Sequence, residues 1–294
     1  ERDEAVEAIA LALGRGLLSA RLPVTRLPSG VGDDAAPPLP PLHVPPALIS
    51  RYSTRFRTRG PEQSRAQNVE TAARYLDGAV IPPRGWLSFN DRVGERSTDR
   101  GYRIAHVIND GEMVDGLGGG VCQVASTLHA AAFLGGLDIL EHVPHSRPSE
   151  YIPMGLDATV VWPNVDLVIS NPHPFVITVR ARGADGQMVV ELFGERREAR
   201  VEWHRQTVAE QEPSDRYVED PEVPTGTEVV SQRPMRGFTI MRERTIYNAR
   251  GAHIETVRIQ YPPTDRIIRV PPCTLDPSTA EPVPVGPTVP ANPF

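Results

Sequence analysis

The chain has 294 residues, which is enough for one or two domains with a substantial core. Hydrophobic residues make up 39% and charged residues 23%, a globular composition, and the longest apolar stretch near the N-terminus is too short to cross a bilayer. The net charge is −6, and arginines are interspersed with acids throughout, which excludes a basic nucleic-acid-binding stripe. The chain begins at Glu1 rather than Met, which fits a mature protein whose leader is gone.

The two cysteines exclude a disulfide framework and a metal centre of the zinc type. Cys122 and Cys273 could pair once, but Cys273 lies in the proline-bounded run "PPCTLDP", so we expect no bridge. No paired zinc-ligand spacing, P-loop, dinucleotide fingerprint or Gly-x-Ser-x-Gly elbow occurs. We therefore expect neither a metal nor a cofactor.

The N-terminal third combines helical periods with a proline-rich break. Residues 4–20 have the period of a short amphipathic helix, and the proline density of residues 27–46 predicts a linker or extended arm. Residues 64–81 again have a helical period, with Ser64 as its N-cap and Gly78 as its stop.

The middle of the chain reads as short strands around one apolar helix. Residues 86–94 read as a strand ending in a turn, and residues 101–116 as a hairpin turning at 109–111. A helix is expected over 121–134, stopped by two glycines. Four β-rich runs follow, at 157–162, 165–170, 175–182 and 188–194.

The composition turns polar and proline-punctuated near residues 205–225. Beyond it, residues 237–261 indicate a hairpin and residues 265–270 a closing strand. Helices followed by strands predict an α+β fold, in which the cysteine-bearing helix packs on a mostly antiparallel sheet, plus a small all-β C-terminal module. The expected domains are an N-terminal helix and linker (1–48), a candidate catalytic domain (49–200), the β module (208–270) and a proline-rich tail (271–294).

Three glycines, Gly118 to Gly120, precede Val121 and Cys122 at the start of the predicted helix. A helix N-terminus stabilises a thiolate, and glycines leave the sulfur unshielded and let a backbone N–H face a developing oxyanion. Cys122 is therefore a candidate nucleophile, with Gly120, Cys122 and Gln123 as oxyanion donors. The alternatives are a buried, inert Cys122 and a Gln123 that caps or packs.

A thiolate nucleophile needs a base, and the base needs an orienting group. His145 is the first candidate for the base, His142 the second, and His129 is expected in the core or at the surface. Asp157 is the expected orienter, with Asp166 as the alternative. The order Cys, His, Asp is the one that papain-like and transglutaminase-like folds use.

Residues 50–195 resemble the VanW domain family, first noted beside vancomycin-resistance genes. The resemblance rests on "GGGVCQ" and on the "HSRPSEYIPMGLDA" run. Members of this family are similar to exported or envelope proteins, and some are linked to peptidoglycan cross-linking as L,D-transpeptidases acting through the cysteine that corresponds to Cys122. Residues 208–270 resemble the glycine-five domain of cell-surface proteins, and we expect this module to position the first domain and carry no chemistry.

One motif departs from the family pattern. Where the family usually has Pro-Gly-Glu-x-Phe-Ser-Phe-Asn, this chain has "PRGWLSFN", so Arg84 and Gly85 replace the Gly-Glu pair. If that glutamate touches substrate, specificity here differs. We expect Ser88, Asn90 and Tyr151 to contact substrate.

The resemblance and the residues together predict an extracytoplasmic cysteine acyltransferase that acts on peptidoglycan stem peptides. The alternatives are a non-catalytic wall-binding or scaffold protein, in which Cys122 is buried and unreactive, and a stem-peptide hydrolase with the same residues and a water acceptor. The residue pattern does not separate transfer from hydrolysis.

Overall fold

The computed structural model describes residues 46–109, 112–249 and 251–275. The predicted helix over 4–20, nearly all of the linker over 27–46 and most of the tail lie outside the described residues. The described chain contains fifteen strands and three α-helices, 44% strand against 18% helix.

The expected fold class is wrong. In place of an α+β fold of papain type with one main sheet, the described chain is mostly β and divides its strands among five sheets. Long strands occur where the sequence indicated none. β1 (Ala47–Arg55) directly follows the predicted linker, and β10 (Arg200–Gln211) lies where the sequence becomes rich in polar residues. β10 is exposed along most of its length, so it lacks the apolar alternation by which a strand is recognised.

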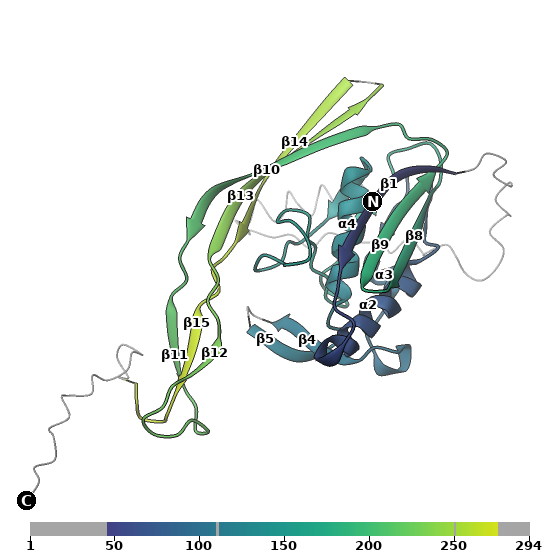
Figure 1. Ribbon diagram of the computed structural model, residues 1–294. Coiled ribbons are helices and arrows are strands. Elements are labelled where there is room, and N and C mark those ends of the chain that lie inside the picture. The colour runs from purple at the N-terminus through teal and green to yellow at the C-terminus, as the bar shows by residue number, and fades with distance from the viewer. Residues whose placement is uncertain (1–45, 110–111, 250, 276–294) are drawn as a thin grey trace, which may run out of the picture. The chain divides into compact units, whose positions relative to one another are not determined.

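The largest sheet is antiparallel, with the order β1-β9-β8-β2, and Figure 1 shows β1, β9 and β8 side by side. β9 (Gln187–Gly194) and β8 (Ile177–Ala184) form a hairpin, and β2 (Val80–Ile81) pairs with the outer edge of β8. In β9 every second side chain, from Met188 to Leu192, is buried. Strand alternation therefore marks the face that the helices cover.

Helix α2 (Gln63–Leu76) packs mainly on β8 and corresponds to the helix expected from residue 64. A 3₁₀ turn at Gly60–Glu62 leads into it, so Ser64 lies inside the helix and is not its cap. Gly78 follows the helix with a φ of 71°, a left-handed conformation that suits glycine.

Helix α4 (Val121–Leu134) has the predicted bounds and lies against β1 and β9 (Figure 1). It is buried nearly all round, as expected of a core helix that is apolar on every face. Hydrogen bonds also join it to β1: among them, Ser50 Oγ donates to the Ala131 carbonyl at 2.6 Å, and the hydroxyls of Thr54 and Thr127 lie 2.9 Å apart. Helix, sheet and α2 share one hydrophobic core.

Two small sheets flank this core. One has the order β3-β7-β6, built from Trp86–Ser88, Val168–Ser170 and Asp138–Glu141, and the other is the predicted hairpin of β4 (Ile104–Asn109) and β5 (Glu112–Leu117). The segment expected as one strand over 86–94 divides at Ser88, whose Oγ accepts the Asp91 N–H at 2.9 Å and caps helix α3 (Phe89–Val93). A second 3₁₀ turn spans Thr98–Arg100.

The C-terminal strands form two further three-stranded sheets. The predicted hairpin is confirmed as β13 (Gly237–Asn248) and β14 (Gly251–Tyr261), and β10 joins it in the order β10-β13-β14. The other sheet has the order β11-β15-β12, built from Asp215–Glu219, Arg266–Val270 and Val229–Gln232. β15 confirms the predicted closing strand. The division of the chain at residue 208 and the glycine-five-like character of residues 208–270 stay predictions.

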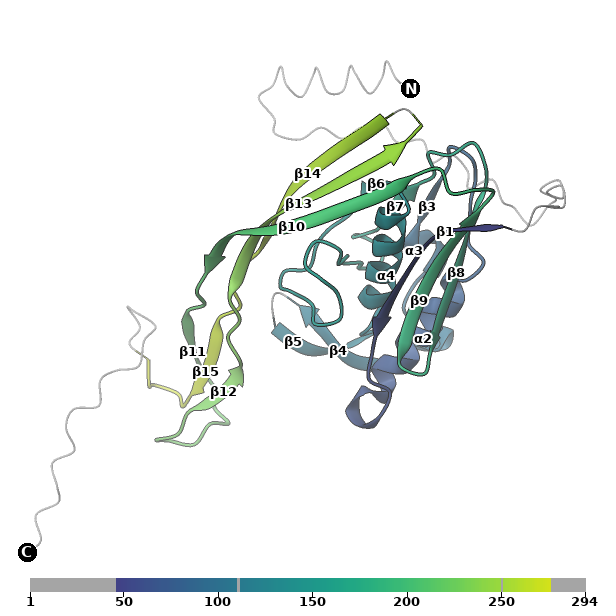
Figure 2. The same ribbon diagram turned by 45° about the horizontal axis from the view of Figure 1, so that its top comes forward.

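Strand β13 supplies buried arginines to the end of helix α4, beside which the β10-β13-β14 sheet lies in both views (Figures 1 and 2). The guanidinium of Arg244 donates to the Phe133 carbonyl at 3.1 Å and to the Leu137 carbonyl at 3.0 Å, and it pairs bidentately with Glu255 on β14. Carbonyls at a helix C-terminus lack partners inside the helix, and Arg244 supplies one. Arg242 and Arg244 each stack over the Phe133 ring at 4.6 Å.

Candidate functional site

The glycine run before Cys122 passes between two other elements. Gly118 and Gly120 have φ values of 82° and 106°, and a Cβ on Gly119 would lie 2.5 Å from the His106 carbonyl oxygen of β4. A Cβ on Gly120 would meet α2 side chains at 3.0 Å. The buried amide of Asn68 on α2 donates to the Gly119 carbonyl at 2.9 Å. Close packing against β4 and α2 therefore requires these glycines and sets where helix α4 begins.

Three side chains on one face of α4 bind the backbone of alternate residues in segment 156–160. The pairs are Cys122 with Val160, Ser126 with Ala158, and His129 with Leu156. The seven steps from Cys122 to His129 rise about 10.5 Å along the helix, and the four steps from Val160 to Leu156 span at most about 13 Å, so the two runs have similar lengths. This matching aligns the segment antiparallel to the helix.

The docking also explains why residues 157–162 are not the predicted strand. Ser126 Oγ donates to the Ala158 carbonyl at 3.2 Å and accepts its N–H at 2.9 Å, while the sulfur of Cys122 lies 3.5 Å from both the N and the O of Val160. Side chains of the helix satisfy the backbone groups that a neighbouring strand would otherwise bind.

His145 and Asp157 meet beside Cys122. His145 Nδ1 lies 3.0 Å from Asp157 Oδ2, which also accepts the His145 backbone N–H at 2.8 Å. The hydrogen bonds that the structure gives the Cys122 sulfur go to the Val160 backbone, and the nearby imidazole lowers the pKa of the thiol. His145 and Asp157 are buried, and Cys122 is half-buried, whereas Cys273 is exposed.

The electrostatics favour a thiolate beside an imidazolium. Burial by itself raises the pKa of Cys122, but the hydrogen bond and charge of His145 outweigh it, and the pKa is lowered below its ordinary value. Burial by itself lowers the pKa of His145. Tyr151, Asp157 and Cys122 outweigh burial, so this pKa lies well above the ordinary value. The two shifts thus act in the same sense, toward a proton on the imidazole.

Both carboxylate oxygens of Asp157 are occupied. Oδ2 faces His145, and Oδ1 accepts the Gly155 N–H at 3.2 Å and the Tyr261 hydroxyl at 2.5 Å. Burial would raise the pKa of Asp157, but the hydrogen bond and charge of His145 and the hydrogen bond from Tyr261 lower it far below the ordinary range. The carboxylate is held ionised in a fixed orientation.

The other two candidate histidines lie apart from the thiol contact. His142 Nε2 lies 2.6 Å from the Asp157 carbonyl oxygen, and its ring stacks on His129 at 4.1 Å. His129 is fully buried with Nδ1 2.8 Å from the Leu156 carbonyl, and burial lowers the pKa of both rings. His129 lies in the core, one of the two places expected for it, and both rings brace the loop that carries Asp157.

The side chain of Gln123 binds β1 and α2. Its buried amide nitrogen donates to Thr54 Oγ1 and to the Arg55 carbonyl, both at 2.9 Å, and its Oε1 accepts from Arg65 at 2.8 Å. Its backbone N–H donates to the Gly120 carbonyl at 3.0 Å. The groups proposed from the sequence as oxyanion donors at Gln123 thus already have partners.

Ser88, Asn90 and Asp166 form a cluster of their own. Asp166 accepts hydrogen bonds from Ser88 Oγ and from the Asn90 backbone N–H, the latter at 2.8 Å, and the Asn90 amide donates to the Val165 carbonyl at 2.8 Å. Ser88 and Asn90 are buried. Asp166, the alternative orienter, is thus engaged by the loop around α3. Tyr151, in contrast, stands edge-on to the His145 ring at 6.5 Å.

Arg96 and Tyr261 belong to this neighbourhood, although the sequence reasoning missed both. The stem of Arg96 packs at the position where a Cβ on Gly118 would stand, its charge helps to lower the pKa of Cys122, and its Nη2 is buried with no hydrogen-bond partner among the described residues. Tyr261 lies 104 positions after the aspartate that it contacts. Neither residue stands in a motif, so only the fold reveals them.

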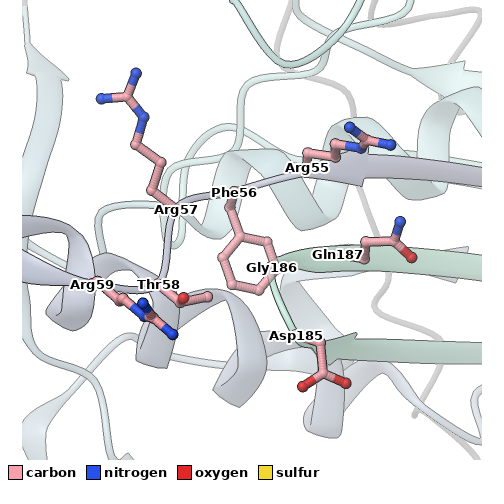
Figure 3. Close-up of a pocket in the computed structure, with 8 residues that line it drawn as sticks. All are labelled: Arg55, Phe56, Arg57, Thr58, Arg59, Asp185, Gly186 and Gln187. Carbon is pink, nitrogen blue, oxygen red and sulfur yellow. The ribbon is translucent and has the colours of Figure 1, made fainter.

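A shallow surface pocket of about 570 Å³ lies elsewhere, between the end of β1 and the β8–β9 turn (Figure 3). Arg55, Arg57 and Arg59 line it with Asp185, and the side chains of Arg55 and Arg57 point away from each other. It contains neither the thiol nor its partners. Among the described residues, no cluster of three metal-binding side chains occurs, and no helix there is both long and apolar enough to span a membrane.

Comparison with known proteins identifies the segment that carries the site. Residues 64–193 match the family model described as "VanW like protein". The uncharacterised protein YoaR of Bacillus subtilis is 36% identical over 151 residues, which cover 51% of this chain and 49% of that protein. The vancomycin B-type resistance protein VanW of Enterococcus faecalis is 23% identical over 140 residues, covering 46% and 51%. The chain thus spans about half the length of the curated relatives it matches. Residues 64–193, with Cys122, His145 and Asp157 among them, thus match the VanW-like family, as the motif around the cysteine predicted.

Proposed function

We propose that this protein is a cysteine acyltransferase that acts on peptidoglycan stem peptides in the cell envelope. The observation that carries the proposal is the buried His145–Asp157 pair, 3.0 Å apart, beside a half-buried Cys122, with the pKa of the thiol lowered and that of the imidazole raised. A merely structural cysteine needs neither an imidazole partner nor a buried carboxylate behind it. The vancomycin-resistance name of one relative supports the cell wall as the site of action.

In the first step, the Cys122 thiolate attacks the carbonyl carbon of an L-centre that precedes a terminal D-amino acid. The C–N bond to the D-amino acid breaks, and the leaving amine takes its proton from the His145 imidazolium. The products are a thioester on Cys122 and a free D-amino acid. Asp157 keeps the imidazole in the orientation that delivers this proton.

In the second step, an amine from a neighbouring stem attacks the thioester carbonyl. His145, now neutral, accepts the proton that the amine loses, and the thiolate of Cys122 leaves. The product is a cross-link between two stems. Water in place of the amine would give a shortened stem and D-amino acid release alone.

Arg96 is the group we propose for the carboxylate of the terminal D-amino acid. Its unpartnered Nη2 and its position against the loop that leads into Cys122 support this role. A guanidinium suits a carboxylate because it offers several donors in a fixed plane. Replacing Arg96 with Lys, which keeps the charge but loses the fork, should raise KM more than it lowers kcat.

The test is mass spectrometry of purified muropeptides incubated with the protein. The proposal predicts loss of a D-amino acid and appearance of dimers with the wild type, and neither product with Cys122→Ala. His145→Ala should lower turnover by about a hundredfold or more, and Asp157→Asn by less. Unchanged muropeptides with active, folded protein would favour a non-catalytic wall-binding role, and monomers without dimers would favour hydrolysis.

A further inference from the structure

Strand β14 ends in a tyrosine that reaches the buried carboxylate of the candidate site. The Tyr261 hydroxyl donates to Asp157 Oδ1 at 2.5 Å and accepts the Gly155 N–H at 2.7 Å. Tyr261 is 1% exposed and so is Asp157, so water does not compete for this contact. The pKa of Tyr261 is raised far above its ordinary value, chiefly by burial and by the neighbouring carboxylate, so the phenol keeps its proton and remains a donor.

A second side chain of the β13–β14 hairpin, hereafter the β13–β14 ribbon, binds the loop that leads into Asp157. Arg242 on β13 donates to the Gly155 carbonyl, and a Cβ on Gly155 would lie 3.2 Å from the Arg242 Cδ. Gly155 has a φ of 90°, a conformation that favours glycine. The turn that leads into Asp157 is thus held at both its N–H and its carbonyl by the β13–β14 ribbon.

We propose that the β13–β14 ribbon completes the site, and that Tyr261 is a positioning residue that acts on Cys122 through Asp157 and His145. Without the hydroxyl, Oδ1 of Asp157 would keep only the longer bond from Gly155, and the carboxylate could turn. Turning would weaken the Oδ2 contact that holds His145. This inference rests on the proposed function, and it departs from the expectation that the C-terminal module carries no chemistry.

The test measures the rate of iodoacetamide alkylation of Cys122 against pH in the full chain, which needs no substrate. Tyr261→Phe should lower the rate at pH 6 by about threefold or more and move the titration midpoint upward, because less imidazolium is held beside the thiol. Tyr247→Phe is the matched control, since this half-exposed β13 tyrosine contacts Glu202 instead, and it should leave the profile unchanged.

A double-mutant cycle separates positioning from general structural support. In an Asp157→Asn background, Tyr261→Phe should have no further effect on alkylation, because the group through which it acts is gone. An equal loss in both backgrounds, or an unchanged rate in Tyr261→Phe, would overturn the inference. Failure of muropeptide turnover would count against the proposed reaction alone, because the alkylation profile reads the thiol directly.

Discussion

At the scale of single residues, the sequence pointed to the groups whose chemistry is rare in the chain. Cys122, His145 and Asp157 stand close together in the sequence and could be chosen by residue type and order. The structure pairs His145 with Asp157 and lets the imidazole lower the pKa of Cys122, while the catalytic roles stay predictions. Residue type and order did not predict that Tyr261 binds Asp157 or that Arg96 packs against the glycine run. Tyr261 comes from a distant strand, and arginines are so common in this chain that one buried example carries no signal of its own.

The reactivity of the two cysteines should differ most at mildly acidic pH. An ordinary thiol has a pKa of about 8.5 and is almost fully protonated at pH 6, whereas the pKa of Cys122 is lowered by His145. Iodoacetamide at pH 6 should therefore label Cys122 before the more exposed Cys273, as peptide mapping would measure. If Cys273 were labelled first in the folded protein, the claim that Cys122 has a lowered pKa would be contradicted.

The pair His145–Asp157 should stabilise the fold most between about pH 4 and pH 6.5. The folded-state pKa of Asp157 is lowered, so its contribution is present above its unfolded pKa near 3.9 and is lost as pH falls below it. The folded-state pKa of His145 is raised, so its contribution is complete below its unfolded pKa near 6.5 and is lost as pH rises through the folded value. Urea unfolding of Asp157→Asn against wild type should show the largest gap in this window.

A matched variant makes that comparison specific. Asp99 is an exposed acid in a 3₁₀ turn, so Asp99→Asn should change the free energy of unfolding little at any pH. If Asp157→Asn followed the same flat profile, the buried pair would contribute nothing to stability.

At the scale of elements, apolar period and turn residues predicted α4, the β4–β5 hairpin and the β13–β14 hairpin well. The segment 157–162 shows the limit of that reading. The segment is rich in β-forming residues, but its backbone N–H groups bind Ser126 and Cys122 of helix α4 instead of a neighbouring strand. The residue pattern alone does not tell whether the partner is a strand or a helix. The exposed strand β10 was not predicted, because its side chains are mostly polar and show no apolar alternation along most of its length.

The departure at Arg84 should cost stability. The turn from Pro82 to Gly85 closes with a 2.9 Å hydrogen bond and places Arg84 at a φ of 59°, in the left-handed region that favours glycine. A non-glycine residue in this region is strained, so Arg84→Gly should raise the free energy of unfolding by about 0.5–1 kcal/mol. Arg84→Ala keeps a Cβ and should bring no such gain. Equal effects of the two variants would mean that the turn carries no strain.

At the scale of the whole described chain, the unexpected feature is how the C-terminal strands engage the family domain. The sequence predicted a hairpin there but no docking, because the residues that dock are arginines that read as ordinary surface charge. Arg244 meets the end of α4, and Trp203 on β10 stands edge-on to Phe133 at 6.2 Å. We therefore expect a chain cut at residue 205 to be less stable, because it lacks both Arg244 and the Tyr261 hydroxyl that binds Asp157.

Arg244 should stabilise the folded protein through its contacts with the end of helix α4. Replacing it with Ala removes the guanidinium donor from the Leu137 carbonyl and the Glu255 carboxylate and leaves the Phe133 carbonyl only the longer bond from Gly136, at a cost of about 2–3 kcal/mol. Thermal unfolding would measure the loss. Arg258→Ala on exposed β14 surface should change stability by less than about 0.5 kcal/mol. A loss for Arg244→Ala no larger than that would mean that the ribbon does not stabilise the helix end.

The central claim is that Cys122 becomes acylated, and intact-protein mass spectrometry tests it most directly. Protein mixed briefly with a stem peptide ending in a D-amino acid, then quenched in acid, should gain the mass of the peptide acyl group without its terminal residue. The adduct should map to Cys122, be removed by hydroxylamine as a thioester is, and be absent from Cys122→Ala. Turnover of the stem peptide with no adduct at any time, or with an equal adduct on Cys122→Ala, would contradict the account.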